Sequence, residues 1–224
     1  MSYILSLETA TTNCSVSLSK NGNTIALKED ARNGYSHAEK LHVFIDDVLN
    51  EAKVARSQID AIAVSKGPGS YTGLRIGVSA AKGLCFALEK PLISLPTLEV
   101  LAHQYSIDSG VIVAMLDARR LEVYSAIFDK NYSQIRATQA QILDETSFSE
   151  YLSKGNVYFI GNGVTKTKEI INHSNAIFIE NKLPSSNEMS AIAYDKYKKS
   201  DTEDVAYFEP YYLKDFVALK PKKS

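Results

Sequence analysis

Alternating apolar and polar positions open the chain. Apolar residues run from position 3 to 7, and residues 14–19 alternate apolar side chains with serines, as half-buried strands do. The dipeptide Asn21-Gly22, which is typical of tight hairpin turns, separates this run from a third apolar run at 24–29. The pattern predicts a three-stranded antiparallel meander at the start of the chain.

The apolar period lengthens to that of a helix after residue 36. Ser36 and Glu39 have the spacing of a capping box, in which each side chain accepts a hydrogen bond from a free amide of the first turn. We therefore expect an amphipathic helix that begins at Ser36. Its apolar face recurs every three or four residues, at Leu41, Phe44, Ile45, Val48, Leu49 and Ala52.

Strands and helices alternate along the rest of the chain. A glycine-rich turn at 67–73 leads into a second helix that runs to about residue 88. The alternation favours an α/β layer fold with a mainly parallel or mixed sheet in each lobe. Strands are expected at 59–65, 92–95, 113–117, 123–128 and 157–160, and further helices at 98–103, 164–172 and 188–199.

Two of the expected hairpins resemble each other. One strand ends at Glu8 and another at Asp117, and each is followed by a tight turn and a returning strand. Either the chain contains a duplicated lobe or two ordinary hairpins are alike by chance. The pattern alone leaves both interpretations open.

Composition narrows the class of protein. Of the 224 residues, 45% are hydrophobic and 23% charged, as in folded globular proteins. The 25 basic and 26 acidic side chains leave a formal net charge of -1, so the chain lacks the positive field of a stand-alone nucleic-acid binder. It has only two cysteines, Cys14 and Cys85, and no stretch typical of a signal peptide or membrane span. We therefore expect a reduced, cytoplasmic protein.

The glycine-rich turn at 67–73 is a candidate anion site, because amides at a helix N-terminus attract anions. Its spacing does not match a P-loop, since no lysine follows Gly73. It does not match a dinucleotide-binding turn either, since Thr72 stands at the position of the last glycine. An anion site and a tight structural turn both stay open.

Small residues form a stripe on the helix that follows this turn. Each glycine inside a helix costs about 1 kcal/mol relative to alanine, so the close approach of another element should compensate. That element is a partner's helix or the chain's own sheet, and the two can coexist on different faces of the helix. In the first case Gly77→Leu should abolish association and leave the monomer folded. The stripe comprises Gly73, Gly77, Ala80, Ala81 and Leu84.

Candidate catalytic groups are few. Glu8 and Asp117 could flank a cleft and hold a metal-bound nucleotide, or each could cap its own turn. Arg119 suits phosphate or carboxylate recognition, and a self-paired surface turn explains it equally well. His37 and His42 are five positions apart and diverge around a helix, which disfavours a histidine metal site. The sequence has no nucleophile elbow and no local signature of a catalytic triad.

Five segments together resemble the TsaB (YeaZ) family of bacterial threonylcarbamoyladenosine biosynthesis subunits, which have a Gcp-like domain. The resemblance covers nearly the whole chain. It implies two ribonuclease-H-like lobes of the actin, sugar-kinase and Hsp70 type, which we place at residues 1–105 and 106–224. The segments are residues 7–16, 36–41, 67–77, 115–124 and 210–214.

The resemblance also implies a vestigial nucleotide cleft, with ATP or ADP bound between the lobes or at a subunit interface. In this superfamily the acids of the two hairpins face the phosphates, and a glycine turn lies near the adenosine. Glu8 stands where relatives more usually have aspartate, which weakens the case for a magnesium site, and we expect no metal. The implied cleft residues are Glu8, Thr9, Asp117, Arg119, Gly161 and Gly163.

The role implied by the resemblance is that of a non-catalytic scaffold. The paralogous transferase TsaD moves threonylcarbamoyl to N6 of the tRNA adenosine beside the anticodon. TsaD has two metal-binding histidines where this chain has only His103. The implied partners are a TsaD-type paralogue, a TsaE-type ATPase and, without the paralogue, a second copy of this chain. We expect tRNA to be reached only through the complex, and no membrane to be involved.

The surface that this role implies lies on the first two helices. It is expected to bind the paralogue and, in its absence, to pair with itself. Its residues are Ser36, His37, Leu41, Gly73, Arg75, Gly77, Ala80, Ala81 and Leu84.

Two other functions remain open. A nucleotide-dependent small-molecule kinase or ATPase of the same superfamily is favoured by Glu8, Asp117 and the turn at Gly161. A magnesium-dependent ATPase rate that is lost in Asp117→Asn would identify it. A peptidase is the second alternative, although the sequence shows no cleavage chemistry. Peptide hydrolysis that is abolished by one serine or histidine substitution would support it.

Overall fold

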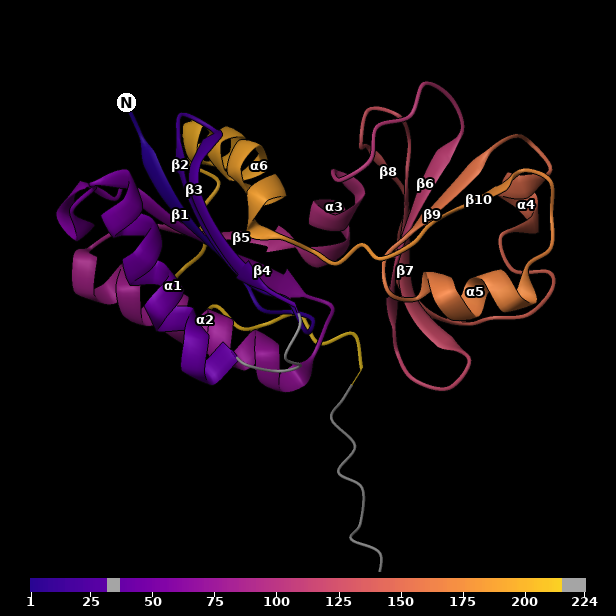
Figure 1. Ribbon diagram of the computed structural model, residues 1–224, viewed down its shortest axis with the longest axis horizontal. Coiled ribbons are helices and arrows are strands. Elements are labelled where there is room, and N and C mark those ends of the chain that lie inside the picture. The colour runs from indigo at the N-terminus through magenta and orange to yellow at the C-terminus, as the bar shows by residue number, and fades with distance from the viewer. Residues whose placement is uncertain (32–36, 215–224) are drawn as a thin grey trace, which may run out of the picture.

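Two lobes, each built on a five-stranded sheet, lie side by side (Figure 1). The structure is a computed structural model, and it describes residues 1–31 and 37–214. The α/β fold with two lobes is confirmed.

The first sheet opens with the predicted antiparallel meander. Its strands are β1 (Tyr3–Glu8), β2 (Cys14–Lys20), β3 (Asn23–Asp30), β4 (Ala61–Gly67) and β5 (Leu92–Pro96), in the order β3-β2-β1-β4-β5. Strands β1, β2 and β3 pair antiparallel, whereas β4 and β5 run parallel to β1.

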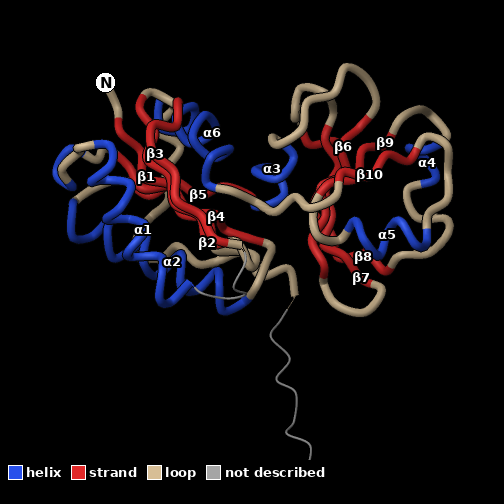
Figure 2. The backbone as a smooth tube through the Cα atoms, viewed as in Figure 1, coloured by secondary structure: helices blue, strands red, loops and turns tan. Residues whose placement is uncertain are grey.

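Helices cover both faces of the first sheet (Figure 2). Helices α1 (His37–Ala52) and α2 (Tyr71–Leu88) pack on one face, and α6 (Ser186–Lys198) packs on the other. The predicted apolar stripe of α1 is confirmed, because Leu41, Ile45, Val48 and Leu49 are buried. A short 3-10 helix, η1 (Arg56–Gln58), precedes β4. Ser36 lies outside the described residues, so its capping box stays a prediction.

The second sheet repeats the topology of the first. Its strands are β6 (Val111–Asp117), β7 (Glu122–Phe128), β8 (Gln134–Ile142), β9 (Val157–Ile160) and β10 (Ala176–Ile179). Their order is β8-β7-β6-β9-β10, so in both sheets the central strand has one antiparallel neighbour from the meander and one parallel neighbour. The shared topology favours the duplicated-lobe interpretation of the two hairpins.

Three short helices pack against the second sheet. Helices α4 (Ser149–Leu152) and α5 (Val164–Ile170) pack on one face of the second sheet. Helix α3 (Thr97–Ala102), which follows β5, packs on the other face and lies between the lobes (Figure 1). The sequence did not predict β8, α4 or β10.

The last part of the chain returns to the first lobe. Met189 and Ala193 of α6 are buried against Ile4 of β1 and Ile93 of β5. The expected boundary between the two lobes, after residue 105, stays a prediction. In space, however, α6 packs with the first lobe, because it covers an apolar sheet face that the first 105 residues leave open.

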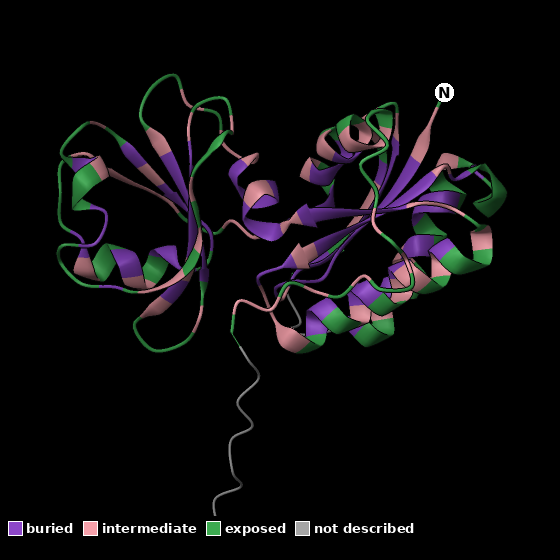
Figure 3. Ribbon diagram, turned by 180° about the vertical axis from the view of Figure 1, so that it is seen from behind, coloured by how far each residue is buried: buried purple, intermediate pink, exposed green. Residues whose placement is uncertain are grey.

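Burial follows the layers of the two lobes. Buried residues concentrate on the strands of both sheets, and the outer helices alternate buried and exposed positions (Figure 3). Within the described ranges, no helix is both long enough and apolar enough to cross a membrane.

Candidate functional site

A cleft of about 440 Å³ lies between the two lobes. The first lobe contributes the turn after β1 and the glycine-rich turn before α2. The second lobe contributes the end of β6 and the turn before α5, and the chain beyond α6 closes one side. The lining residues are Ala10, Thr11, Thr12, Pro68, Gly69, Ser70, Tyr71, Thr72, Leu116, Asp117, Ala118, Arg119, Tyr124, Asn162, Tyr211, Tyr212, Leu213 and Lys214.

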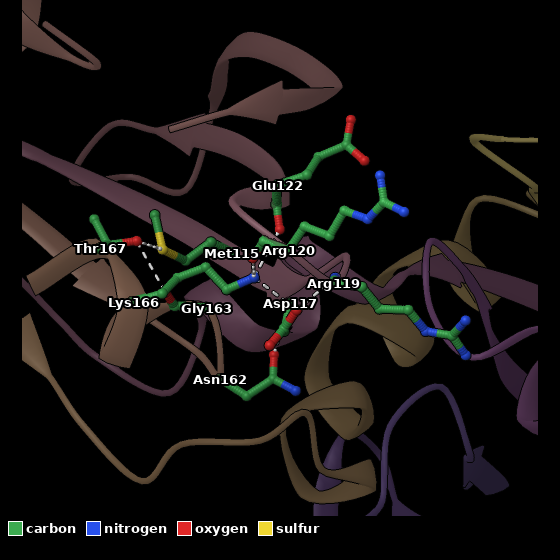
Figure 4. Close-up of polar contacts among 9 residues, drawn as sticks. All are labelled: Met115, Asp117, Arg119, Arg120, Glu122, Asn162, Gly163, Lys166 and Thr167. Atoms are coloured by element: carbon green, nitrogen blue, oxygen red, sulfur yellow. Dashed lines mark hydrogen bonds and ion pairs between the residues drawn. The ribbon is translucent and has the colours of Figure 1, made fainter. Parts of the chain in front are cut away.

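Asp117 is held by a network within its own lobe (Figure 4). Lys166 Nζ lies 2.8 Å from Asp117 Oδ1, and it also donates to Arg120 O at 2.6 Å. The Arg119 amide donates to the same carboxylate oxygen at 2.6 Å. The Asp117 carboxylate therefore caps its own turn, and the Lys166 ammonium balances its charge. This arrangement agrees with the interpretation that Asp117 is a capping residue.

The turn before α5 packs directly under this network. The Asp117 amide donates to Asn162 Oδ1 at 2.8 Å. Gly161 has a φ of +116°, and a Cβ atom there would lie only 2.0 Å from Met115 O. Gly163 is also crowded, by the side chains of Val123 and Met115. Of the implied cleft residues in this lobe, Asp117 and Arg119 line the cleft and the two glycines support it from behind.

Glu8 lies beneath the cleft rather than in it. Its side chain is fully buried, and Glu8 Oε1 accepts a hydrogen bond from the Ala10 amide at 2.6 Å. Burial raises the pKa of this carboxyl to about 7, although the Ala10 amide partly offsets the effect. Thr9 is buried as well, and its hydroxyl donates to Gly73 O at 2.8 Å. The two hairpin acids therefore do not face a common opening, because Glu8 points into its own lobe.

The glycine-rich turn packs against the turn after β1. The Ser70 amide donates to Ala10 O at 2.7 Å. A Cβ atom on Gly69 would lie 2.5 Å from Ala10 O, and one on Gly73 would lie 2.1 Å from Thr9 O. Ser70 caps α2 by accepting from the Gly73 amide at 3.3 Å. These close contacts explain why Gly69 and Gly73 have no side chain, as expected of a tight structural turn.

The small-residue stripe of α2 faces the chain's own core. A Cβ atom on Gly77 would lie 2.2 Å from Thr9 Oγ1, and Ala81 is fully buried. The premise of the Gly77→Leu prediction was therefore wrong, since that substitution would collide inside the monomer. Ala80 and Leu84 are partly buried against the same core.

Three further residues predicted for an interface also have partners within the chain. His37 is 1% exposed, and its Nε2 lies 2.7 Å from Thr11 O. Burial lowers the pKa of this imidazole. Leu41 is fully buried, whereas Arg75 is exposed and donates to the Tyr212 hydroxyl at 3.2 Å. Whether any of these residues meets a partner protein stays a prediction.

Two apolar side chains on the outer helices were missed. Val43 of α1 is 54% exposed and Phe86 of α2 is 84% exposed. Phe86 lies outside the small-residue stripe of α2. A large apolar residue between Cys85 and Ala87, off the buried face of the helix, was the available signal.

The described residues offer little reactive chemistry. Burial raises the pKa of the Cys14 thiol to about 11 and that of the Cys85 thiol to about 12, which keeps both protonated. The ring of His103 stacks on Tyr132 at 4.0 Å, and its Nδ1 lies 2.9 Å from Glu99 O. Across residues 1–31 and 37–214, no group of three histidine, cysteine or acidic side chains is placed to hold a metal ion.

Comparisons with known proteins agree with one another. The model of the TsaD family, described as tRNA N6-adenosine threonylcarbamoyltransferase, matches residues 32–222. The chain is 30% identical over 225 residues to the tRNA threonylcarbamoyladenosine biosynthesis protein TsaB of Escherichia coli, which covers 97% of this chain and 96% of that protein. A transferase of Staphylococcus epidermidis is 38% identical over 118 residues, which is 46% of this chain and 34% of that protein.

Solved structures give the same result. The structure of YeaZ from Pseudomonas aeruginosa superposes with a TM-score of 0.82 at 27% identity, and the match covers 95% of this chain and 100% of that one.

Proposed function

Since the chain belongs to the TsaD family of tRNA threonylcarbamoyladenosine biosynthesis proteins and matches TsaB over nearly its whole length, we propose that it is a non-catalytic scaffold subunit. Its task is to support a TsaD-type transferase that modifies N6 of the tRNA adenosine beside the anticodon. A TsaE-type ATPase acts in the same assembly, which works in the cytoplasm.

The chemistry of the described residues supports a non-catalytic role. The two thiols have raised pKa values, and Asp117 is paired with Lys166. Glu8 is buried away from the cleft. A subunit built in this way contributes a surface, and its partner contributes the reacting groups.

The observation that carries the proposal is the exposure of large apolar side chains on the outer helices. Phe86 is 84% exposed and Val43 is 54% exposed. An aromatic side chain that is almost wholly exposed on a helix is a candidate anchor for a partner protein, because aromatic residues are enriched at interfaces. The paralogue covers this surface in the working complex, and a second copy of the chain covers it otherwise.

In this proposal, nucleotide and tRNA are less important to the function of this chain than its partner protein. The cleft offers Arg119 beside a neutralised Asp117, which suits the phosphates of ATP or ADP better than a magnesium ion. With a formal net charge of -1, the chain has no strong field for tRNA, so tRNA is bound mainly by the partner.

Light scattering on a sizing column tests the scaffold role. The wild-type chain, Phe86→Asp and Ile142→Asp are each run alone and with the TsaD-type protein of the same organism. Ile142 is 70% exposed in the other lobe and is therefore the matched control. We expect Phe86→Asp to lose both the homodimer and the mixed complex, while Ile142→Asp keeps them.

A different result would redirect the assignment. If the wild-type chain stays monomeric and forms no mixed complex, the scaffold role is wrong, and a stand-alone nucleotide-dependent enzyme becomes the better hypothesis. If Phe86→Asp still binds the paralogue with unchanged affinity, the interface lies elsewhere.

A further inference from the structure

A second opening, distinct from the cleft, lies where the first sheet meets the start of α6. Its volume is about 410 Å³, which is within the range of small-molecule sites. We call it the α6 pocket. The lining residues that matter here are Asn13, Glu29, Asp30, Lys182, Asn187 and Glu188.

Two side-chain amides of the α6 pocket already donate within the protein. Asn13 Nδ2 donates to Pro184 O at 3.0 Å, which fixes the orientation of this amide. The Asn187 side-chain amide donates to Glu188 Oε1 at 2.9 Å. These two amides are therefore not available to a ligand, and the Lys182 ammonium is the charged donor of the lining.

Two acceptor oxygens of the same lining have no hydrogen-bond donor among the described residues. Asn13 is only 4% exposed, and its Oδ1 is a buried oxygen without a hydrogen-bond partner among the described residues. Glu188 Oε2 is a second buried oxygen in the same condition. A buried acceptor without a donor costs free energy, and a ligand that supplies N–H groups removes that cost.

The charges of the α6 pocket favour a cation. Glu29 and Glu188 are both carboxylates of the lining, whereas Asp30 is ion-paired with Lys40. Lys182 opposes a cation but balances only one carboxylate. A metal ion is disfavoured, because no triplet of metal-ligating side chains is found in the described ranges.

We propose that the α6 pocket binds a small organic cation bearing a primary ammonium or a guanidinium group on an alkyl chain. The N–H groups of this cation meet Asn13 Oδ1 and Glu188 Oε2, and its charge is balanced by Glu29 and Glu188. The site is separate from the cleft between the lobes, and its occupancy does not depend on the scaffold role.

Isothermal titration calorimetry with agmatine and spermidine, in an amine-free phosphate buffer, tests the proposal. Tetramethylammonium is the matched probe, because it has the charge but no N–H donor. We expect one-site binding of an amine probe and weaker or no binding of tetramethylammonium. Glu188→Gln is expected to raise the Kd of the bound probe at least tenfold.

Two further variants test the sign of the charge and its position. Lys182→Gln removes the opposing cation and is expected to lower the Kd. Glu169→Gln removes an exposed acid of α5 that does not line the pocket, and it is expected to leave the Kd unchanged. In the wild-type chain, the side-chain amide signals of Asn13 in an NMR spectrum should shift on titration.

Three results would overturn the proposal. They are the absence of saturable binding at millimolar amine, equal binding of tetramethylammonium, and an unchanged Kd in Glu188→Gln. Circular dichroism of each variant shows whether it is folded, and the Asn13 signals give a readout that needs no substitution.

Discussion

Glu8 shows at the scale of one residue how burial changes a carboxyl group. Its folded-state pKa of about 7 lies above the ordinary value of 4.5, so the folded state holds a proton that the unfolded state releases. Its contribution to stability is fully present below pH 4.5 and is lost as the pH rises through 7. Above that range the buried charge opposes folding.

Glu8→Gln should remove this pH dependence, because the amide stays neutral at every pH. Between pH 5 and 8 the wild-type free energy of unfolding is expected to fall by about 2.5 kcal/mol relative to the variant. Urea unfolding at several pH values measures the difference, with Glu169→Gln as an exposed control. Parallel pH profiles for the wild type and Glu8→Gln would contradict it.

Gly77 and Gly83 lie on the same helix and should respond in opposite ways to alanine. A Cβ atom on Gly77 would meet Thr9 Oγ1, whereas one on Gly83 has nothing within 4 Å. Gly83→Ala should therefore stabilise the protein by up to about 1 kcal/mol through helix propensity. Gly77→Ala should destabilise it, because the buried hydrogen bond from Thr9 to Gly73 O must move. Urea unfolding measures both, and stabilisation by both substitutions would exclude the clash.

The element scale is best illustrated by α6, which docks through serines as well as apolar residues. Ser17 Oγ of β2 donates to Ser186 O at 2.7 Å, and the Ser186 amide donates to Ser15 Oγ at 3.0 Å. These serines are fully buried. Paired hydroxyl groups therefore fix where α6 sits on the sheet, while Met189 supplies apolar contact.

Ser17→Ala should loosen α6 selectively. It removes the hydroxyl donor from the Ser186 carbonyl, which keeps its helical amide donor, so the loss should cost about 0.5–1.5 kcal/mol. Ser19→Ala is the control, because Ser19 is equally buried but donates to Ile4 O within the sheet. Hydrogen exchange should accelerate in the α6 amides of Ser17→Ala more than in those of Ser19→Ala. Equal exchange in the two variants would show that the serine contact does not position α6.

Elements were predictable where the apolar period is strong. The stripe of α1 and the meander follow directly from it, but β8 has polar residues such as Gln134, Thr138 and Gln141 along an edge strand that buries little. Strand β10 has four residues, all half-buried, which is too short for a period. The ion pair of Lys166 and Asp117 joins residues 49 positions apart, and no local pattern encodes such a contact.

At the scale of the whole molecule, the chain beyond α6 ties the two lobes together. Lys82 Nζ of α2 donates to Phe208 O at 2.9 Å and to Ala206 O at 3.1 Å, which holds this segment on the first lobe. Farther along, Lys214 forms an ion pair with Glu122 of the second lobe at 2.5 Å. The segment therefore runs from one lobe to the other beside the cleft.

Lys82→Met should release this segment, because the methionine side chain cannot donate to the two carbonyls. Chymotrypsin should then cut after Tyr207 or Phe208 several-fold faster than in the wild type. Lys53→Met, at an exposed lysine after α1, is the matched control. Equal cleavage rates in the two variants would mean that other contacts hold the segment.

The return of α6 to the first lobe also affects the order in which the protein can fold on the ribosome. Strands β6 to β10 form one continuous stretch, so the second sheet can be completed as soon as that stretch has emerged. The first sheet emerges earlier, but one of its faces, which includes Ile4 and Ile93, stays uncovered until Met189 and Ala193 have been synthesised. The lobe that is translated first is therefore completed last, and during that interval its open face is the part of the nascent chain most in need of a chaperone.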